Sequence, residues 1–193
     1  SFGVQQENIF GSGQNLGVQI STSKYNTYYV VSTTDPYFTE DGVSRSFSFS
    51  HRSSKPYVEQ GGDYRLISES VALNFGIPFS ELDRVFTGVG VEQTEIVPGT
   101  NLPASYLAYA NTFGYTTKTV PLSVGWARDG RDSYLNPSSG KFMRANSDMG
   151  VVGDTRYIRM GTQYQQYVPL TKQYTFAFNA DFGLGKDRKS TRL

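Results

Sequence analysis

The twelve residues Gln173 to Leu184 constrain this chain more than any other stretch. Their even-numbered positions are apolar or aromatic, and their odd-numbered positions are polar or small. A period of two over this length predicts a β-strand with one apolar and one polar face. Residues 156–168 show the same alternation, and residues 169–172 between the two runs predict a tight turn. The C-terminal part of the chain therefore predicts a β-hairpin.

The hairpin pattern extends through the whole sequence and predicts an all-β fold, an antiparallel up-and-down meander of about ten strands. A short helix is expected inside the longest connection, where Pro103 precedes a run of helix-forming residues. Residues 186–193 leave the alternation, and we expect a disordered or foreign tail after a barrel domain at 1–185. The strands are expected near residues 1–10, 14–23, 28–35, 43–52, 64–77, 84–92, 119–130, 141–150, 156–168 and 173–184, and the helix near 103–112.

The lengths and polar faces of these strands favour part of a transmembrane β-barrel. Several exceed the ~5–6 residues that are usual in soluble proteins and match the ~9–11 of a tilted membrane-spanning strand. Their polar faces carry Gly, Ser, Asn and Gln and few of the Lys and Glu that cover soluble surfaces. Short connections such as 11–13 alternate with long ones such as 93–118, as in outer-membrane barrels. A soluble β-sandwich or ligand-binding barrel, with the aromatic faces forming its core, stays open as an alternative.

In a membrane barrel, each strand divides its residues between lipid and lumen. The apolar positions expected to face lipid are Leu16, Val18, Ile20, Phe47, Phe49, Val71, Leu73, Phe75, Leu122, Val124, Ile158, Met160, Phe176, Phe178 and Phe182. The positions expected to face the lumen are Gln19, Ser48, Asn74, Gly125, Arg159, Gln163, Asn179 and Asp181.

Aromatic residues near the predicted strand ends have two interpretations. They form the interfacial girdles of a membrane barrel, or they are present because Tyr is a good strand former. These residues are Tyr25, Tyr28, Tyr37, Phe38, Tyr64, Trp126, Tyr134, Tyr157, Tyr167 and Tyr174.

The composition argues against most catalytic and metal sites. The 193 residues include no cysteine and one histidine, and the net charge of +1 gives no reason to expect a nucleic-acid partner. His51 is interpreted as a solvated loop histidine because a triad or histidine metal site needs partners that the chain lacks. Asp129, Asp132 and Asp148 lack the dense spacing of a calcium loop. We therefore expect no cofactor and no enzymatic activity.

Four segments, in this order, resemble the BamA family of outer membrane protein assembly factors. The first is Val4 to Gly13 and the second is Asp35 to Ser44. The third joins Val124-Gly125-Trp126 to a turn that contains Asp132 and Tyr134. The fourth is Tyr167 to Leu170. The turn residues that carry the resemblance are Asp35, Pro36, Tyr37, Phe38, Asp41, Gly42, Pro137 and Gly140.

The resemblance covers residues 1 to about 185 and implies a function. Family members fold and insert β-barrel proteins into the outer membrane of Gram-negative bacteria, with lipoprotein partners and without a cofactor. Outer-membrane lipid, client barrel proteins and assembly lipoproteins are thus the implied partners. The resemblance also implies that the chain begins at the family's second strand and lacks the periplasmic POTRA repeats and the later strands. A passive outer-membrane pore or secretion barrel remains the alternative.

Overall fold

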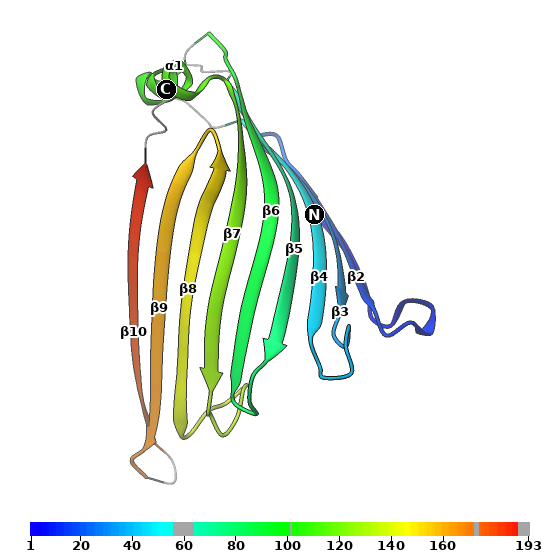
Figure 1. Ribbon diagram of the computed structural model, residues 1–193, viewed down its shortest axis with the longest axis vertical. Coiled ribbons are helices and arrows are strands. Elements are labelled where there is room, and N and C mark those ends of the chain that lie inside the picture. The colour runs from blue at the N-terminus through cyan, green and yellow to red at the C-terminus, as the bar shows by residue number, and fades with distance from the viewer. Residues whose placement is uncertain (56–63, 101, 172–173, 189–193) are drawn as a thin grey trace.

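The computed structural model describes residues 1–55, 64–100, 102–171 and 174–188. Ten antiparallel strands form one sheet whose spatial order is the sequence order, from β1 to β10 (Figure 1). The expected all-β meander is therefore confirmed. The strands are β1 (Phe2–Gln6), β2 (Asn15–Thr22), β3 (Asn26–Asp35), β4 (Ser44–Ser54), β5 (Arg65–Pro78), β6 (Asp83–Val97), β7 (Thr116–Asp129), β8 (Gly140–Gly153), β9 (Arg156–Pro169) and β10 (Thr175–Arg188).

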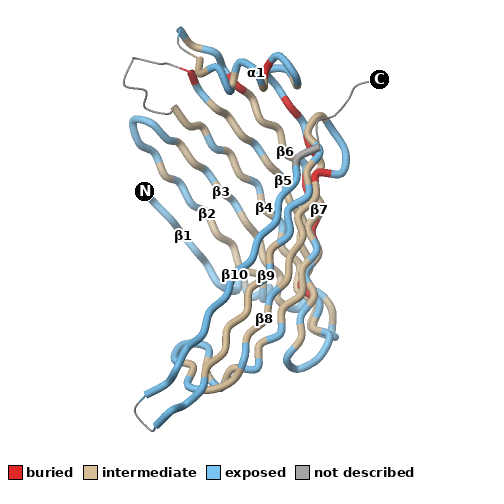
Figure 2. The backbone as a smooth tube through the Cα atoms, turned by 90° about the vertical axis from the view of Figure 1, so that its left-hand side faces the viewer, coloured by how far each residue is buried: buried red, intermediate tan, exposed pale blue. Residues whose placement is uncertain are grey.

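The sheet curves into an open trough with β1 and β10 at its two free edges (Figure 2). Neighbouring strands pair in long registers, and β9 and β10 alone share fourteen paired positions. We call the end with the β3–β4, β5–β6, β7–β8 and β9–β10 connections the turn end. The opposite end, the loop end, carries the longest connection, between β6 and β7, which contains the helix (Figure 1). It also carries short connections, between β2 and β3 and between β8 and β9, so the expected division into short turns and long loops holds only in part.

The helix α1 (Ala104–Phe113) covers the loop end of the sheet. It starts after Pro103 and stops at Gly114, whose φ of 90° is available to glycine at little cost. The Tyr106 ring lies 5.4 Å from the Tyr64 ring, centroid to centroid. These contacts tie α1 to the beginning of β5.

Little of this molecule is buried. Among the described residues, the buried hydrophobic side chains are Tyr64, Ile96 and Ala110. Ala110 belongs to α1, Tyr64 contacts Tyr106 of α1, and Ile96 lines a hollow with Tyr106. Burial of apolar surface is the main driving force for folding. The described part of the sheet nevertheless leaves most of its large apolar side chains partly or strongly exposed. No helix among the described residues is long and apolar enough to cross a membrane.

Several element boundaries differ from those expected. β1 ends at Gln6 and is followed by a 3₁₀ turn at Ile9–Gly11, because Asn8 takes the left-handed conformation with φ 55°. β6 is longer than expected and runs to Val97. β10 reaches Arg188, so residues 186–188 of the expected tail belong to a strand. The rest of that tail, 189–193, and most of the expected loop after β4 lie outside the described residues.

Candidate membrane-spanning surface and lumen

The strand register divides the sheet into two faces. Residues directly opposite each other on paired strands point to the same side. One continuous row joins Ser46, Asn74, Gly88, Ser123, Asp148 and Arg159 from β4 to β9. All eight positions predicted to face the lumen lie on the side of this row, which we call the inner face.

All fifteen positions predicted to face lipid lie on the other side, the outer face. Many of these apolar side chains are strongly exposed: Phe182 is 63% and Met160 53% exposed. The two sets of positions that alternation separates in the sequence thus lie on opposite faces of the sheet. Contact of the outer face with lipid stays a prediction.

The inner face is concave and polar. A hollow of about 390 Å³ extends over it from Thr34 on β3 to Arg144 and Asp148 on β8. Residues of six successive strands line one hollow only if the sheet curves toward that side. Asn74 and Asn146 also line this hollow, so the inner face presents amide, hydroxyl and charged groups.

Glycines on the inner face let polar side chains lie flat on the sheet. A Cβ added at Gly88 would lie 2.1 Å from Asn74 Oδ1 and 2.6 Å from Ser123 Oγ. At Gly161 it would meet Asn146 Oδ1 at 2.9 Å. We did not predict these glycine–side-chain pairs. A glycine such as Gly88 is visible within a strand pattern, but its partners come from other strands.

Polar groups bound the apolar part of the outer face at the loop end. His51 Nδ1 lies 3.0 Å from Glu69 Oε1, and the register continues this row to Gln93 and Lys118. His51 belongs to β4 and makes a cross-strand contact, so its interpretation as a loop histidine was wrong. β4 continues past His51 to Ser54, and the register places His51 directly opposite Glu69 on β5.

At the turn end, the outer face carries Trp126. Its indole N–H donates to Asp83 Oδ1 at 3.1 Å, and Arg128 lies 3.7 Å from the same carboxylate. This arrangement, with an apolar ring and a polar tip, suits a membrane interface. Three other residues expected in the girdle lie on the inner face instead: Tyr28, Tyr157 and Tyr167.

The turn between β3 and β4 has a compact, internally bonded geometry. Asp35 Oδ1 accepts a hydrogen bond from the Tyr37 N–H at 3.2 Å, as in an Asx turn. Gly42 follows with φ 82°, a conformation that favours glycine. The Phe38 ring stacks under the Arg45 guanidinium, 4.0 Å from centroid to Cζ. The turn thus holds an aromatic ring at the outer rim of the turn end. Pro36 and Asp41, the other two residues of this turn that carry the family resemblance, also lie between β3 and β4.

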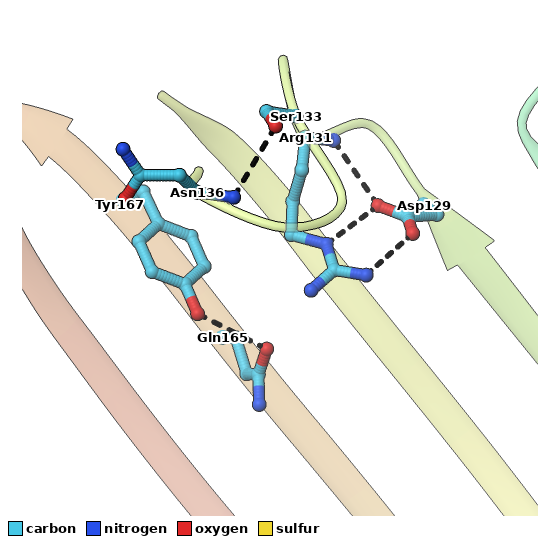
Figure 3. Close-up of polar contacts among 6 residues, drawn as sticks. All are labelled: Asp129, Arg131, Ser133, Asn136, Gln165 and Tyr167. Atoms are coloured by element: carbon cyan, nitrogen blue, oxygen red, sulfur yellow. Dashed lines mark hydrogen bonds and ion pairs between the residues drawn. The ribbon is translucent and has the colours of Figure 1, made fainter. Parts of the chain in front are cut away.

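The turn between β7 and β8 is organised by two carboxylates. Asp129 accepts two hydrogen bonds from the Arg131 guanidinium, at 2.8 and 2.6 Å (Figure 3). This guanidinium also lies 4.8 Å from the Phe142 ring centroid. Its hydrogen bonds to Asp129 raise the pKa of Arg131.

Asp132 holds the far side of the same turn. It accepts hydrogen bonds from the Ser138 hydroxyl and from the backbone N–H groups of Ser138 and Ser139, the latter two at 2.9 and 3.1 Å. These bonds lower the pKa of Asp132 far below its ordinary value, with the Ser138 hydroxyl contributing most. Pro137 lies within the turn, and Gly140 closes it with φ 105°. None of the described residues forms a group of three or more potential metal ligands.

Comparison with known proteins agrees with this geometry. The Omp85 superfamily domain matches residues 8–192. The outer membrane protein assembly factor BamA of Neisseria meningitidis serogroup B is 28% identical over 198 residues, covering 95% of this chain and 24% of that protein. The crystal structure of BamA from Haemophilus ducreyi lacking POTRA domains 1-3 superposes with a TM-score of 0.80 at 21% identity, covering 96% of this chain and 38% of that one. The chain thus spans less than half the length of either relative. It belongs to the Omp85 superfamily.

Proposed function

We propose that this chain is the membrane-embedded barrel portion of a factor that folds and inserts β-barrel proteins into the outer membrane of a Gram-negative bacterium. The observation that supports this most directly is the two-faced sheet, with exposed apolar side chains outside and a concave polar wall inside. The assembly-factor name of the Neisseria relative supports the specific role.

In this proposal, lipid covers the outer face. Side chains such as Phe178 and Met160 would be about half exposed to water without it. Hydrocarbon also requires that every backbone group find a partner within the protein. A sheet of long, in-register strands meets this requirement everywhere except at its edges and at local breaks in the ladder.

The assembly activity would use a sheet edge and no bond-making chemistry. An unpaired strand presents a row of N–H and C=O groups to which an extended client segment can add. In the described sheet, β1 and β10 have such edges. Client barrel proteins and assembly lipoproteins are the proposed partners, without a cofactor.

The experiment is client folding in proteoliposomes. The native protein is reconstituted with its lipoproteins, and an unfolded outer-membrane barrel is added in limiting amount. We expect folded, protease-resistant client with heat-modifiable mobility to accumulate faster than in empty liposomes or in liposomes with a passive porin. Equal folding rates in all three would contradict the proposal. Ion conductance without client folding would instead identify a passive pore.

A further inference from the structure

Pro121 interrupts the hydrogen-bond ladder in the middle of β7. This strand is paired on both sides, with β6 and β8. Proline has no N–H to donate, so within sheets it is normally confined to edges and bulges. β6 and β7 pair from Val89–Leu122 and again from Glu92–Thr119 in the same register, but not at the two positions between. Pairing at both positions requires a hydrogen bond from the N–H of residue 121 to the carbonyl of residue 90. Proline has no such N–H, so this one absent donor accounts for the whole gap.

The ladder is irregular on the other side of β7 at the same height. Pro121 pairs with Gly150, but Val120 pairs with Val152, so Val151 is an extra residue opposite a continuous β7. Such a bulge bends its strand and weakens local pairing. The two irregularities therefore lie in one line across β6, β7 and β8.

A hollow lies against this line on the inner face. This hollow of about 290 Å³ lies over Gly90 and Pro121, with Asp148 and Arg159 among its lining residues. Gly90 itself has no side chain, and a Cβ there would lie 2.7 Å from the Val71 carbonyl oxygen. A polar hollow of this size can hold water that hydrates the Gly90 carbonyl. Hydration of this kind would give the Gly90 carbonyl a hydrogen-bond partner in place of the missing cross-strand N–H.

The segments on the two sides of this line have different attachments. Toward the loop end, Thr117 Oγ1 lies 3.5 Å from the Tyr109 hydroxyl of α1, and that hydroxyl lies 3.2 Å from Thr155 Oγ1. The Lys118 carbonyl accepts a hydrogen bond from the Asp154 N–H at 2.8 Å. Toward the turn end, residues 122–129 of β7 keep an unbroken register with β8. The α1-bearing corner and the wall below it thus have different attachments along β7, while β5 and β6 stay paired across the line.

We propose that Gly90, Pro121 and the Val151 bulge form a hinge in the sheet. About this hinge, the α1-bearing loop end bends relative to the turn end and changes how far α1 covers the inner face. The hinge would control access to the polar trough from the loop end. The competing interpretation is a rigid bulge that only sets the curvature of the wall.

The test is residue-resolved hydrogen exchange of the native protein in lipid nanodiscs. Gly90 lies in the gap and Glu92 and Thr119 border it, and we call the amides of these three residues the flanking amides. Gly88 and Ser123 form a ladder pair below the gap. One hydrogen bond changes a local opening equilibrium by about three- to tenfold, so we expect exchange faster by that factor at the flanking amides. Equal exchange at the flanking and the lower amides in the wild-type protein would overturn the hinge, whatever any variant does.

Pro121→Thr supplies the missing N–H and a small polar side chain like that of Thr119. We expect it to slow exchange at the flanking amides by about the same three- to tenfold. Leu122→Val, one residue along and with its N–H retained, is the matched control and should leave exchange unchanged. If Pro121→Thr folds and exchanges like wild type, the missing donor does not loosen the sheet and the proposal fails.

Distance measurements test the bending itself. Spin labels at Asn111→Cys on α1 and Leu135→Cys in the β7–β8 turn occupy exposed positions on the two sides of the hinge. We expect a broad distance distribution in the wild-type background and a narrower one with Pro121→Thr. A single narrow distribution in both backgrounds would overturn the hinge in favour of the rigid bulge.

Discussion

The outer and inner faces of the sheet are made by the same strands but are sensitive to opposite changes. The outer face carries bulky, exposed side chains such as Phe178, which have room around them but lie in an apolar surface. The inner face carries groups such as Asn74 that already lie against glycine backbone. Charge should therefore disrupt the outer face, and added volume the inner one.

The largest effect is expected from charge on the outer face. Phe178→Arg places a guanidinium in the middle of the apolar side of β10 and should cost ~2–4 kcal/mol of folding free energy in a bilayer. The measurement is denaturant unfolding of the native protein in lipid vesicles, followed by far-UV circular dichroism and heat-modifiable mobility.

Asn179→Arg is the matched control, because the neighbouring residue points to the inner face. It should be tolerated, since the polar trough accepts charge. Equal tolerance at residues 178 and 179 would remove the distinction between the two faces and argue against a lipid-facing surface.

Added volume on the inner face should have the next largest effect. Gly88→Ala forces Asn74 and Ser123 to move, because the new Cβ would lie 2.1 and 2.6 Å from their side-chain oxygens. The atoms that must move are side-chain oxygens rather than backbone, so we expect a cost of about 1–2 kcal/mol, the lower part of the range for overpacking. The same unfolding measurement reports it.

Gly183→Ala makes the identical chemical change on the inner face of β10, where the nearest atom is the Met160 carbonyl oxygen at 3.8 Å. It should be neutral. Asn74→Ala in the Gly88→Ala background should restore part of the loss. If Gly88→Ala were also neutral, the flat arrangement of Asn74 over Gly88 would not matter for stability.

A smaller effect is expected at the rim of the outer face. Trp126→Phe keeps an aromatic ring but removes the hydrogen bond to Asp83, and it should cost about 1 kcal/mol. Asp83→Asn keeps an acceptor for the indole and loses the ion pair with Arg128, whose side chain is 51% exposed. The Ser80 hydroxyl, which donates to Asp83 Oδ2 at 2.7 Å, can accept a hydrogen bond from the new amide instead. Such exposed ion pairs contribute little, so Asp83→Asn should cost less than Trp126→Phe. A larger cost for Asp83→Asn than for Trp126→Phe would show that the charge of Asp83, rather than the indole hydrogen bond, stabilises this part of the outer face.

The smallest effect concerns the β7–β8 turn and its pH dependence. The hydrogen bonds from Ser138 and Ser139 depress the pKa of Asp132 in the folded state. Its stabilising contribution is therefore fully present above the unfolded pKa of about 3.9 and is lost as the pH falls through the lower folded pKa.

Asp132→Asn should flatten this acid-side dependence while leaving the unfolding midpoint at pH 7 slightly lowered. The readout is amide exchange or limited proteolysis with an acid-active protease within residues 130–140 between about pH 5 and pH 2. An unchanged pH profile in the variant would show that another group titrates there.

Much of this fold was predictable because its main signal is local. The alternation around Phe176, Phe178 and Asn179 assigns each residue to a face without knowledge of any neighbouring strand. The Asp-Gly dipeptide at residues 41–42 marks a turn for the same reason, since it depends on backbone conformation at two positions. Strand ends were less predictable, as the extension of β10 to Arg188 shows.

The candidate site was predictable only in part. Cross-strand partners lie far apart in the chain, so the contact between His51 and Glu69 and the position of Asn74 over Gly88 depend on register. The sequence left two interpretations open for Tyr157, because proximity to a strand end does not say which face a side chain occupies, and the register places it on the inner face.

A meander of two-faced strands could be read directly from the order of the residues, because a period of two is a property of consecutive positions. The pairing of distant residues, the hollow of the trough and the opening in the ladder depend on how separate strands come together in space. Pro121 illustrates the division. Its missing N–H is visible in the sequence, but the Gly90 carbonyl that loses a partner is known only from the register of β6 and β7.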